Sequence, residues 1–206
     1  MPSLELSVSE LLNQLSSPDF FEREEAVRRL AEIEEDEAIA GLVMALEDED
    51  RGIRELAAEN LVDLRRDITG RLLARFLGHE DISVRNLAAE VLVKIGDSAL
   101  PALVEALEDP HHDIRKFALD IIGLIGAPSV AARVAECLND PNDNVACSAA
   151  EALGLIGSPE TTQALLDAFA TNEFLRPQAG EALGRIGDPS AFYNLCQYLD
   201  SNDPVV

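Results

Sequence analysis

The feature that most constrains this chain is a repeat of 30 or 31 residues. Leucine or isoleucine anchors recur with spacings of 31, 31, 30, 31 and 30 residues, at Leu30, Leu61, Leu92, Ile122, Leu153 and Leu183. An alanine stands four residues before each anchor, at Ala26, Ala57, Ala88, Ala118, Ala149 and Ala179. Because positions four residues apart share one face of an α-helix, we predict one helix with a narrow Ala/Leu stripe in every repeat, called helix A.

A second helix, called helix B, is predicted in every repeat. Its anchors keep the same period, at Leu46, Leu77, Leu107, Leu138, Phe169 and Leu199. Between helices A and B come glycines that suit a helix end, and prolines that suit the first turn of the next helix: Gly96, Gly126, Pro128, Gly157, Pro159, Gly187 and Pro189. Helix, turn, helix and loop at a fixed period predict an all-α, right-handed α-solenoid of about six helix pairs.

The predicted boundaries follow from the anchors. We expect an N-terminal capping helix within residues 1–16 and a repeat array over residues 17–206, with repeats at about 17–47, 48–78, 79–108, 109–139, 140–170 and 171–202. Residues 203–206 match the start of a seventh repeat. We therefore expect that the chain is part of a longer array, or that its last repeat packs on something, with self-association as one option.

Composition narrows the class of partner. Hydrophobic residues make up 47 % and aromatic residues only 4 %, which suits closely packed helices. The 39 acidic residues outnumber the 16 Lys and Arg, for a net charge of -23. Nucleic acids and acidic membranes are disfavoured, because binding to either rests on Lys and Arg. We expect a protein partner, with a basic segment as the electrostatically favoured ligand.

The cysteines and the apolar runs indicate a cytoplasmic protein. Cys137, Cys147 and Cys196 are odd in number and form no Cys-x-x-Cys motif, which is typical of reduced thiols. The opening residues 1–5 lack the basic and apolar character of a signal peptide. No apolar run approaches the ~18 residues of a membrane span.

Two segments carry a resemblance to a known family. Residues 84–92 (VRNLAAEVL) and residues 149–157 (AAEALGLIG) resemble bacterial HEAT-like repeats of the phycobilisome-lyase type. The resemblance implies a helical repeat scaffold whose B helices line the concave face. The family includes bilin lyase subunits and non-catalytic scaffolds. It therefore implies, as an alternative, a lyase or chaperone-like subunit that acts on a tetrapyrrole-bearing protein. The start of a seventh repeat at residues 203–206 leaves open a further alternative, a structural segment of a longer multidomain protein.

The position seven residues before the A anchor is an arginine in most repeats, and we call this set of residues the arginine column. It holds Arg23, Arg54, Arg85, Arg115 and Arg176. In the first three repeats an aspartate precedes the arginine by four residues, at Asp19, Asp50 and Asp81. This spacing permits ion pairs at the helix start. We interpret the column as a structural Asp/Arg ladder that ties loops to helix starts; a ligand-binding row of arginines is the alternative.

The exposed face of the B helices is the predicted binding surface. The residues at equivalent positions of this face differ chemically from repeat to repeat, as expected of a surface that is free to specialise for a partner. The candidates for partner binding are Arg71, Arg75, Glu105, Glu136, Asp167 and Tyr193. They predict a positive patch followed by an acidic strip, which suits a protein or extended peptide with the complementary charge order.

The sequence indicates no catalytic site, no cofactor and no metal site. It has no Gly-rich phosphate loop, nucleophile elbow or His-Glu-x-x-His motif. The His-Glu pairs that di-iron hydroxylases built on HEAT repeats carry in helix A are missing at the matching positions. The loop residues His79, His111 and His112 leave metal binding open. We therefore predict a non-catalytic interaction scaffold whose partner and oligomeric state the sequence does not identify.

Overall fold

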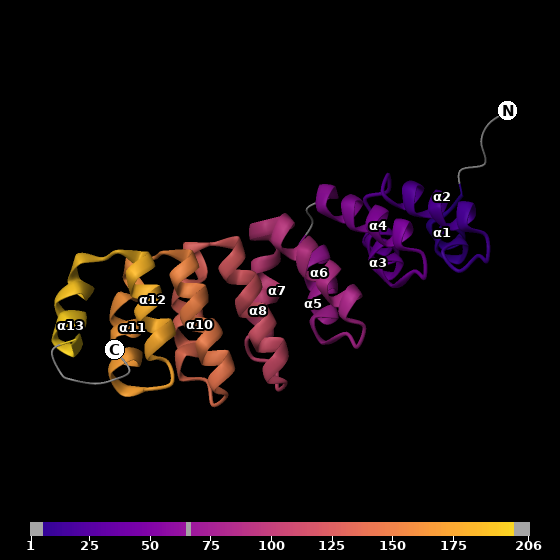
Figure 1. Cartoon of the computed structure of the whole chain (residues 1–206). Coiled ribbons are helices and arrows are strands. Elements are labelled where there is room, and N and C mark those ends of the chain that lie inside the picture. Colours follow the sequence, from indigo (N-terminus) through magenta and orange to yellow (C-terminus); the bar gives the residue numbers. More distant parts are fainter. Residues whose placement is uncertain (1–5, 65–66, 200–206) are drawn as a thin grey trace. The chain divides into compact units, whose positions relative to one another are not determined.

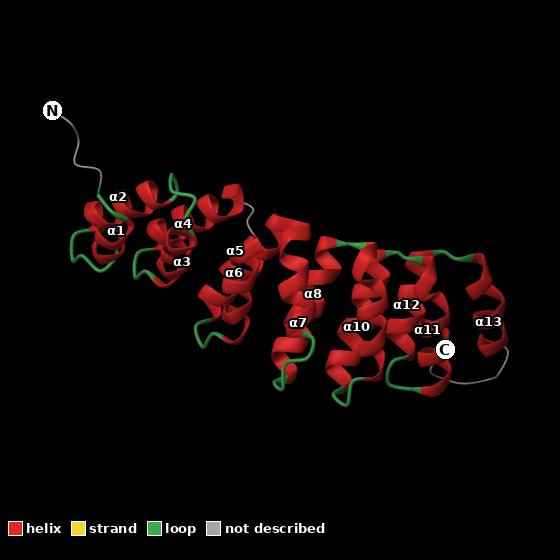
Figure 2. Ribbon diagram, turned by 180° about the vertical axis from the view of Figure 1, so that it is seen from behind, coloured by secondary structure: helices red, strands yellow, loops and turns green. Residues whose placement is uncertain are grey.

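The computed structural model describes residues 6–64 and 67–199, and side chains up to Cys196. All described elements are helices joined by short loops, as Figure 2 shows. The chain divides into two compact units between Pro101 and Ala102, inside one of these helices. Each unit is described separately below (Figure 1).

Unit 1 begins with a short helix and continues as helix pairs. Helix α1 (Val8–Gln14) precedes the pairs α2 (Phe20–Leu30) with α3 (Asp36–Met44), and α4 (Arg51–Leu64) with α5 (Asp67–Ala74), followed by α6 (Ile82–Ile95). Short 3-10 turns lie at η1 (Ala45–Glu47), η2 (Arg75–Gly78) and η3 (Gly96–Ala99). The boundary between the units falls within α7 (Leu100–Ala106).

Unit 2 continues the same alternation. Its pairs are α8 (His112–Ile125) with α9 (Ala131–Glu136), α10 (Asp143–Ile156) with α11 (Thr162–Thr171), and α12 (Arg176–Ile186) with α13 (Pro189–Leu199). The 3-10 turns are η4 (Pro128–Val130), η5 (Cys137–Asn139) and η6 (Pro159–Thr161). In this numbering the A helices are α2, α4, α6, α8, α10 and α12.

The predicted Ala/Leu stripe is the core of both units. All the alanines that precede the anchors are fully buried, and the A anchors are at most 2 % exposed. The described B anchors, from Leu46 to Phe169, are at most 5 % exposed. The small alanines let neighbouring helices approach closely, so a core with few aromatic side chains can still pack densely.

Glycines end four of the A helices as predicted. Gly126, Gly157 and Gly187 adopt left-handed φ values of 71°, 70° and 67°, and Gly96 has φ 61°. L-residues with a Cβ atom rarely adopt such angles, so glycine fits these helix ends. Pro128, Pro159 and Pro189 then stand in the first turn of the next element, where no backbone donor is needed.

Helix α1 packs on the first helix pair. Ser7 and Glu10 form a capping box: the Ser7 amide donates to Glu10 Oε2 at 2.8 Å, and the Glu10 amide donates to Ser7 Oγ at 3.3 Å. Leu11 is buried, and a Cβ atom on Gly41 of α3 would lie 2.5 Å from Leu12 Cδ2. Helix α1 therefore lies directly against α3. None of the described helices is long and apolar enough to cross a membrane.

Candidate protein-binding surface

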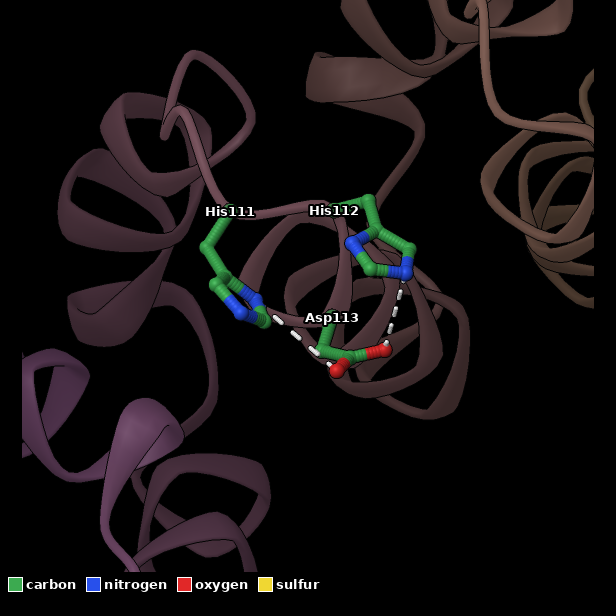
Figure 3. A group of neighbouring side chains, drawn as sticks. All are labelled: His111, His112 and Asp113. Carbon is green, nitrogen blue, oxygen red and sulfur yellow. Dashed lines mark ion pairs between the residues drawn. The ribbon is translucent and has the colours of Figure 1, made fainter.

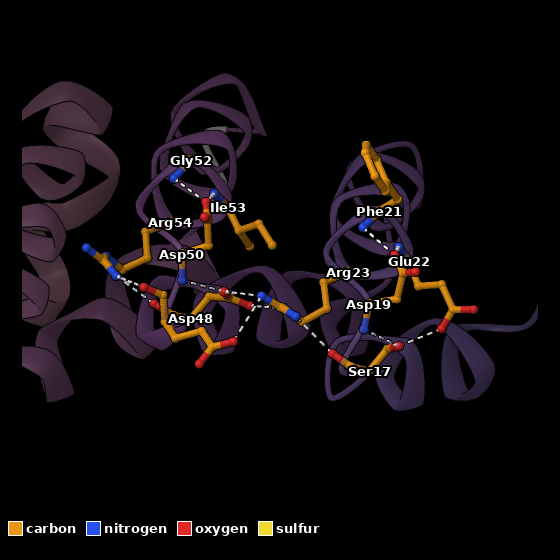
Figure 4. Close-up of polar contacts among 11 residues, drawn as sticks. Ser17, Asp19, Phe21, Glu22, Arg23, Asp48, Asp50, Gly52, Ile53 and Arg54 are labelled. Carbon is orange, nitrogen blue, oxygen red and sulfur yellow. Dashed lines mark hydrogen bonds and ion pairs between the residues drawn. The ribbon is translucent and has the colours of Figure 1, made fainter.

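The arginines of the column stand near the starts of the A helices and contact the loops between repeats. We call this side of each unit the loop edge. In unit 1, the Arg23 guanidinium binds Asp48 in the following repeat with two bonds, Nε to Oδ2 at 2.8 Å and Nη2 to Oδ1 at 3.2 Å (Figure 4). Arg23 Nη1 also donates to the Ser17 carbonyl at 3.0 Å. The two side chains are only 8 % and 6 % exposed. The hydrogen bond with Asp48 raises the pKa of Arg23 above its usual value.

The same clamp recurs in unit 2. Arg115 Nε and Nη2 bind the Asp140 carboxylate at 2.7 and 2.8 Å, and Nη1 donates to the Asp109 carbonyl at 2.9 Å. Burial alone would raise the pKa of Asp140. The hydrogen bonds from Arg115 and from the Asn142 amide, with the Arg115 charge, outweigh burial and hold that pKa below its ordinary value. Each clamp ties a helix start to its own loop and to the next one.

The aspartates expected to pair with the ladder arginines make other contacts. Asp19, Asp50 and Asp81 accept hydrogen bonds from first-turn amides of their own helices, at 2.7 to 2.8 Å for the shortest bond of each. A short carboxylate just before a helix reaches the free amides of that helix. The carboxylate that binds Arg23 or Arg115 instead comes from the next loop, 25 residues later.

The other arginines of the column bind loop backbone. Arg54 Nη1 donates to the Asp48 carbonyl at 2.7 Å, and Arg85 Nη1 donates to the His79 carbonyl at 2.8 Å. Arg176 Nε donates to the Phe169 carbonyl at 3.2 Å. These bonds engage the guanidinium groups in loop contacts, which favours a structural role for the column over a ligand-binding one.

In unit 2 the B helices carry a row of exposed acidic side chains. Glu105 lies on α7, Glu136 on α9 and Asp167 on α11, and all three are exposed. Arg133 of α9 binds both Glu136 and Glu108 and so neutralises part of the row. Asp167 accepts a hydrogen bond from Gln163 at 2.8 Å and has no cationic partner among the described residues. Glu105 likewise has no cationic partner among the described residues, so negative charge is least compensated at Glu105 and Asp167.

Asp167 also lines a cleft between successive B helices. The cleft has a volume of about 430 Å³ and lies between α9 with η5 on one side and α11 with its following loop on the other. The half-buried Ala135, Ala164 and Ala168 supply apolar surface, and Asn139 and Asn172 supply polar groups. Small-ligand sites are commonly of this size, and the exposed lining of this cleft is more polar than apolar. The cleft could accept a side chain with an apolar stem and a cationic end.

The remaining predicted surface residues are also exposed. Tyr193 of α13 is 71 % exposed. In unit 1, Arg71 of α5 and Arg75 of η2 are both exposed. Arg65 and Arg66, two further basic residues of the same predicted repeat, lie outside the described residues. The predicted charge order from Arg71 and Arg75 to the acidic row spans both units and stays a prediction.

The loop histidines make only exposed contacts. Figure 3 shows His111 and His112 on either side of Asp113, with nitrogen–oxygen distances of 3.8 and 3.7 Å. Their ligand atoms lie within 4.8 Å of one another, which suits a metal ion, but all three side chains are exposed. They also stand at the start of α8, the positive end of its dipole, which disfavours a cation. His79 Nε2 contacts Glu47 at 2.8 Å.

The environments of two cysteines disfavour nucleophilic chemistry. Burial raises the pKa of Cys137, and the Asp140 charge raises it further. Burial, followed by the charges of Glu151 and Asp143, raises the pKa of Cys147. Because the thiolate is the reactive form, both thiols are less nucleophilic at neutral pH than an ordinary cysteine.

Sequence comparison identifies the family of the chain. A model described as HEAT repeats matches residues 69–118, 100–176 and 136–206, which together span more than half of the chain. The protein therefore belongs to the HEAT-repeat family, so the all-α solenoid predicted from the period and the HEAT-like type implied by the resemblance are both confirmed. A model described as PBS lyase HEAT-like repeat matches residues 22–48. No curated protein matches the sequence.

Three solved structures show what this chain is similar to. Drosophila melanogaster Mini spindles TOG3 is similar with a TM-score of 0.62 at 16% identity, covering 89% of this chain and 96% of that one. The complex of CpcE and CpcF of phycocyanin lyase from Nostoc sp. PCC7120 has a TM-score of 0.40 at 27% identity, covering 95% of this chain and 82% of that one. A designed armadillo repeat protein in complex with the peptide (KR)4 has a TM-score of 0.45 at 20% identity, covering 88% of this chain and 100% of that one.

Three features of this surface were missed from the sequence. The clamp could have been found, because Asp48 follows Arg23 by 25 residues and Asp140 follows Arg115 by the same number. Arg133 could not have been found from the repeat, because its column holds no other arginine and periodicity gives no signal for a single substitution. The cleft depends on the separation of α9 and α11, which no single residue encodes.

Proposed function

We propose that this protein is a non-catalytic interaction scaffold, and that the B-helix surface of unit 2 binds an extended basic segment of another protein. The observation that carries the proposal is the cleft between α9 and α11, where Asp167 combines an exposed carboxylate with adjacent apolar surface. A lysine or arginine side chain matches both features, because its methylene stem packs on the half-buried Ala164 and Ala168 while its charge meets Asp167.

Charge and rigidity support this function. The net charge of -23 attracts basic segments over a distance. Helices that are already packed need little ordering when a ligand binds, so less of the interaction energy is lost to entropy. Glu105 extends the acidic row beyond the cleft and offers a further contact to a ligand that lies across the B helices.

The test is a fluorescence anisotropy titration of the full chain with a labelled peptide of alternating Lys and Arg. We expect saturable binding that weakens with salt, and a Kd at least about tenfold higher for Asp167→Lys, which corresponds to about 1.4 kcal/mol. Glu151→Lys is the matched control, because it makes the same charge change on an exposed helix-A position of the same unit. Equal weakening by both variants would show unspecific attraction and overturn the proposal.

The lyase alternative has its own observation and test. Residues 22–48 match the PBS lyase HEAT-like repeat, which favours a subunit that handles a tetrapyrrole-bearing protein. Such a subunit should bind a bilin chromophore and give visible absorption that co-elutes with the chain. The raised pKa of Cys147 argues against attachment at that thiol. A colourless chain after incubation with bilin would remove this alternative.

A further inference from the structure

Arg71 and Arg75 of unit 1 are exposed cations without a partner in the described part of the chain. Every other lysine and arginine that the structure describes makes an ion pair or a hydrogen bond, from Arg23 at its clamp to Arg185 with Glu181. Arg71 and Arg75 make neither with any described residue. Because the chain holds 39 acidic residues against 16 Lys and Arg, carboxylates are abundant. Two unpaired guanidinium groups are therefore available to an anion from another molecule.

The two arginines share one face of the same helix. Arg71 belongs to α5 and Arg75 opens η2, which continues α5 because Ala74 keeps helical dihedral angles, φ -56° and ψ -28°. Side chains four residues apart on a helix have Cβ atoms about 5–6 Å apart, so the two positive charges repel each other. Asp67, one turn before Arg71, is exposed and makes no ion pair with it. A carboxylate placed between the two guanidinium groups would bind both and relieve their repulsion.

The adjacent B helix of unit 1 adds an exposed apolar side chain. Met44 of α3 and Arg75 each stand two residues before their B anchors, Leu46 and Leu77, so they occupy equivalent positions of successive repeats. Helices α3 and α5 contact each other, and Met44 is 61 % exposed. Packed helices lie about 8–10 Å apart, and an exposed methionine suits an apolar contact because its side chain is flexible and polarisable. This face therefore places one apolar side chain about one helix spacing from two arginines.

We propose that Arg71, Arg75 and Met44 bind an acidic segment of another protein, in which an apolar residue stands about three positions from the carboxylates. The spacing follows because an extended chain advances about 3.3 Å per residue, so three residues span the distance between α3 and α5. The planar guanidinium group suits a carboxylate, to which it donates two parallel hydrogen bonds. Inorganic phosphate would bind the arginines without using Met44, and the net charge of -23 repels a nucleic acid. An acidic segment with an apolar residue matches all three side chains.

The test is a fluorescence anisotropy titration of the full chain with a labelled peptide that carries a leucine three positions before two glutamates. Salt at about 150 mM screens the long-range repulsion between peptide and chain. We expect saturable binding and a Kd at least about tenfold higher when Arg71→Ala and Arg75→Ala are combined. Arg51→Ala is the matched control, because it removes the same charge from an 82 % exposed arginine of unit 1 that is paired with Glu55. It should leave the Kd unchanged, and circular dichroism checks that the variants fold.

A second peptide, with serine in place of leucine, tests the apolar contact. It should bind wild type more weakly than the leucine peptide does, and Met44→Ser should remove that difference. The proposal is overturned by a lack of saturable binding, by equal weakening in the double variant and in Arg51→Ala, or by equal affinity of wild type for the two peptides. The outcome is independent of the proposed function, because the basic peptide is measured against Asp167→Lys in unit 2 and the acidic peptides against side chains of unit 1.

Discussion

The two units share a repeat but bring their A helices together differently. In unit 2 the position after the anchor is Gly123 or Gly154, and each of these glycines lies against an alanine backbone of the next helix. In unit 1 the same position holds Val62 in α4 and Val93 in α6, both half-buried. One repeat pattern therefore accommodates different side-chain volumes at this register, so the glycine contact between successive A helices belongs to unit 2 and is not required by the fold.

The loop clamp is common to both units. Arg23 binds Asp48 in unit 1, and Arg115 binds Asp140 in unit 2, with the same atoms and the same separation of 25 residues. Helix packing can therefore vary while the loop edge is held by the same bidentate pair. The predictions that follow test which features are shared by the units and which are specific to one of them.

The largest effect should come from breaking the clamp. Arg115→Ala leaves the Asp140 side chain, only 9 % exposed, without its cationic partner. We expect unit 2 to lose about 3 kcal/mol of stability, measured by urea unfolding followed by circular dichroism. Arg23→Ala should destabilise unit 1 in the same way. Arg28→Ala, which removes an ion pair at a 57 % exposed arginine, is the control and should change little; equal losses would contradict the clamp.

The next effect tests the close helix contact in unit 2. Helix propensity alone predicts that Gly154→Ala stabilises α10. The 2.9 Å approach to Ala182 predicts the opposite, a loss of about 1–3 kcal/mol from overpacking. A higher or lower urea midpoint for Gly154→Ala than for wild type shows which of the two effects on stability is larger. In unit 1, Val93→Ala removes side-chain volume without creating a clash, so any loss of stability in that variant cannot come from overpacking. A stabilised Gly154→Ala variant would show that the contact is not tight.

A smaller effect is expected from the helix caps. Asn142 Oδ1 accepts hydrogen bonds from the Asn144 and Val145 amides at 3.0 and 3.3 Å. Asn142→Ala should cost about 1 kcal/mol of unfolding free energy. In unit 1 the corresponding caps are aspartates, such as Asp81 at the start of α6. Replacing Asp81 with Asn should preserve the cap, and a large loss there would mean that its charge matters more than its hydrogen bonds.

The pH dependence follows from Asp140. Its folded-state pKa lies below the ordinary value, so its stabilising contribution is complete above the unfolded-state pKa of about 4 and is lost as pH falls through the folded-state pKa. Wild type should therefore lose more stability between pH 7 and pH 3 than Asp140→Asn does. The check is the difference between the urea midpoints at the two pH values. Parallel losses in the two proteins would contradict this role for Asp140.

The smallest effect sharpens the glycine comparison. Gly184→Ala places a methyl group in open space on an exposed helix, so it should stabilise α12 by about 0.5–1 kcal/mol. Urea unfolding followed by circular dichroism measures this gain. Opposite signs for Gly154→Ala and Gly184→Ala would separate a packed glycine from an unpacked one. A loss at both positions would mean that backbone requirements, and not neighbours, select glycine.

Much of the fold could be predicted, because the core is periodic. Ala26 and Leu30 are buried because every repeat places the same stripe on the same helix face, and Gly126 adopts φ 71° because a helix ends there. Contacts between repeats were harder to predict. Asp19 and Asp48 are both loop aspartates, and only the geometry shows that Asp19 caps its own helix while Asp48 binds Arg23.

The candidate site was predicted only in outline. Asp167 was expected to be exposed on a B helix because its column varies between repeats, and the structure places it at the exposed rim of a cleft. The cleft itself depends on how far α9 stands from α11, and the neutralisation of Glu136 depends on one arginine, Arg133. Distances between helices and isolated substitutions leave no periodic signal, so they cannot be predicted from the repeat pattern.

The most direct test of the proposed function is backbone amide hydrogen exchange of the full chain, with and without a saturating Lys/Arg peptide. The account predicts slower exchange with peptide in α9, η5, α11 and the loop at 172–175, and unchanged exchange on the A helices α8 and α10. Protection confined to the A helices, or to the acidic segment 32–50, would contradict it, because the basic ligand would then bind a surface other than the cleft at Asp167.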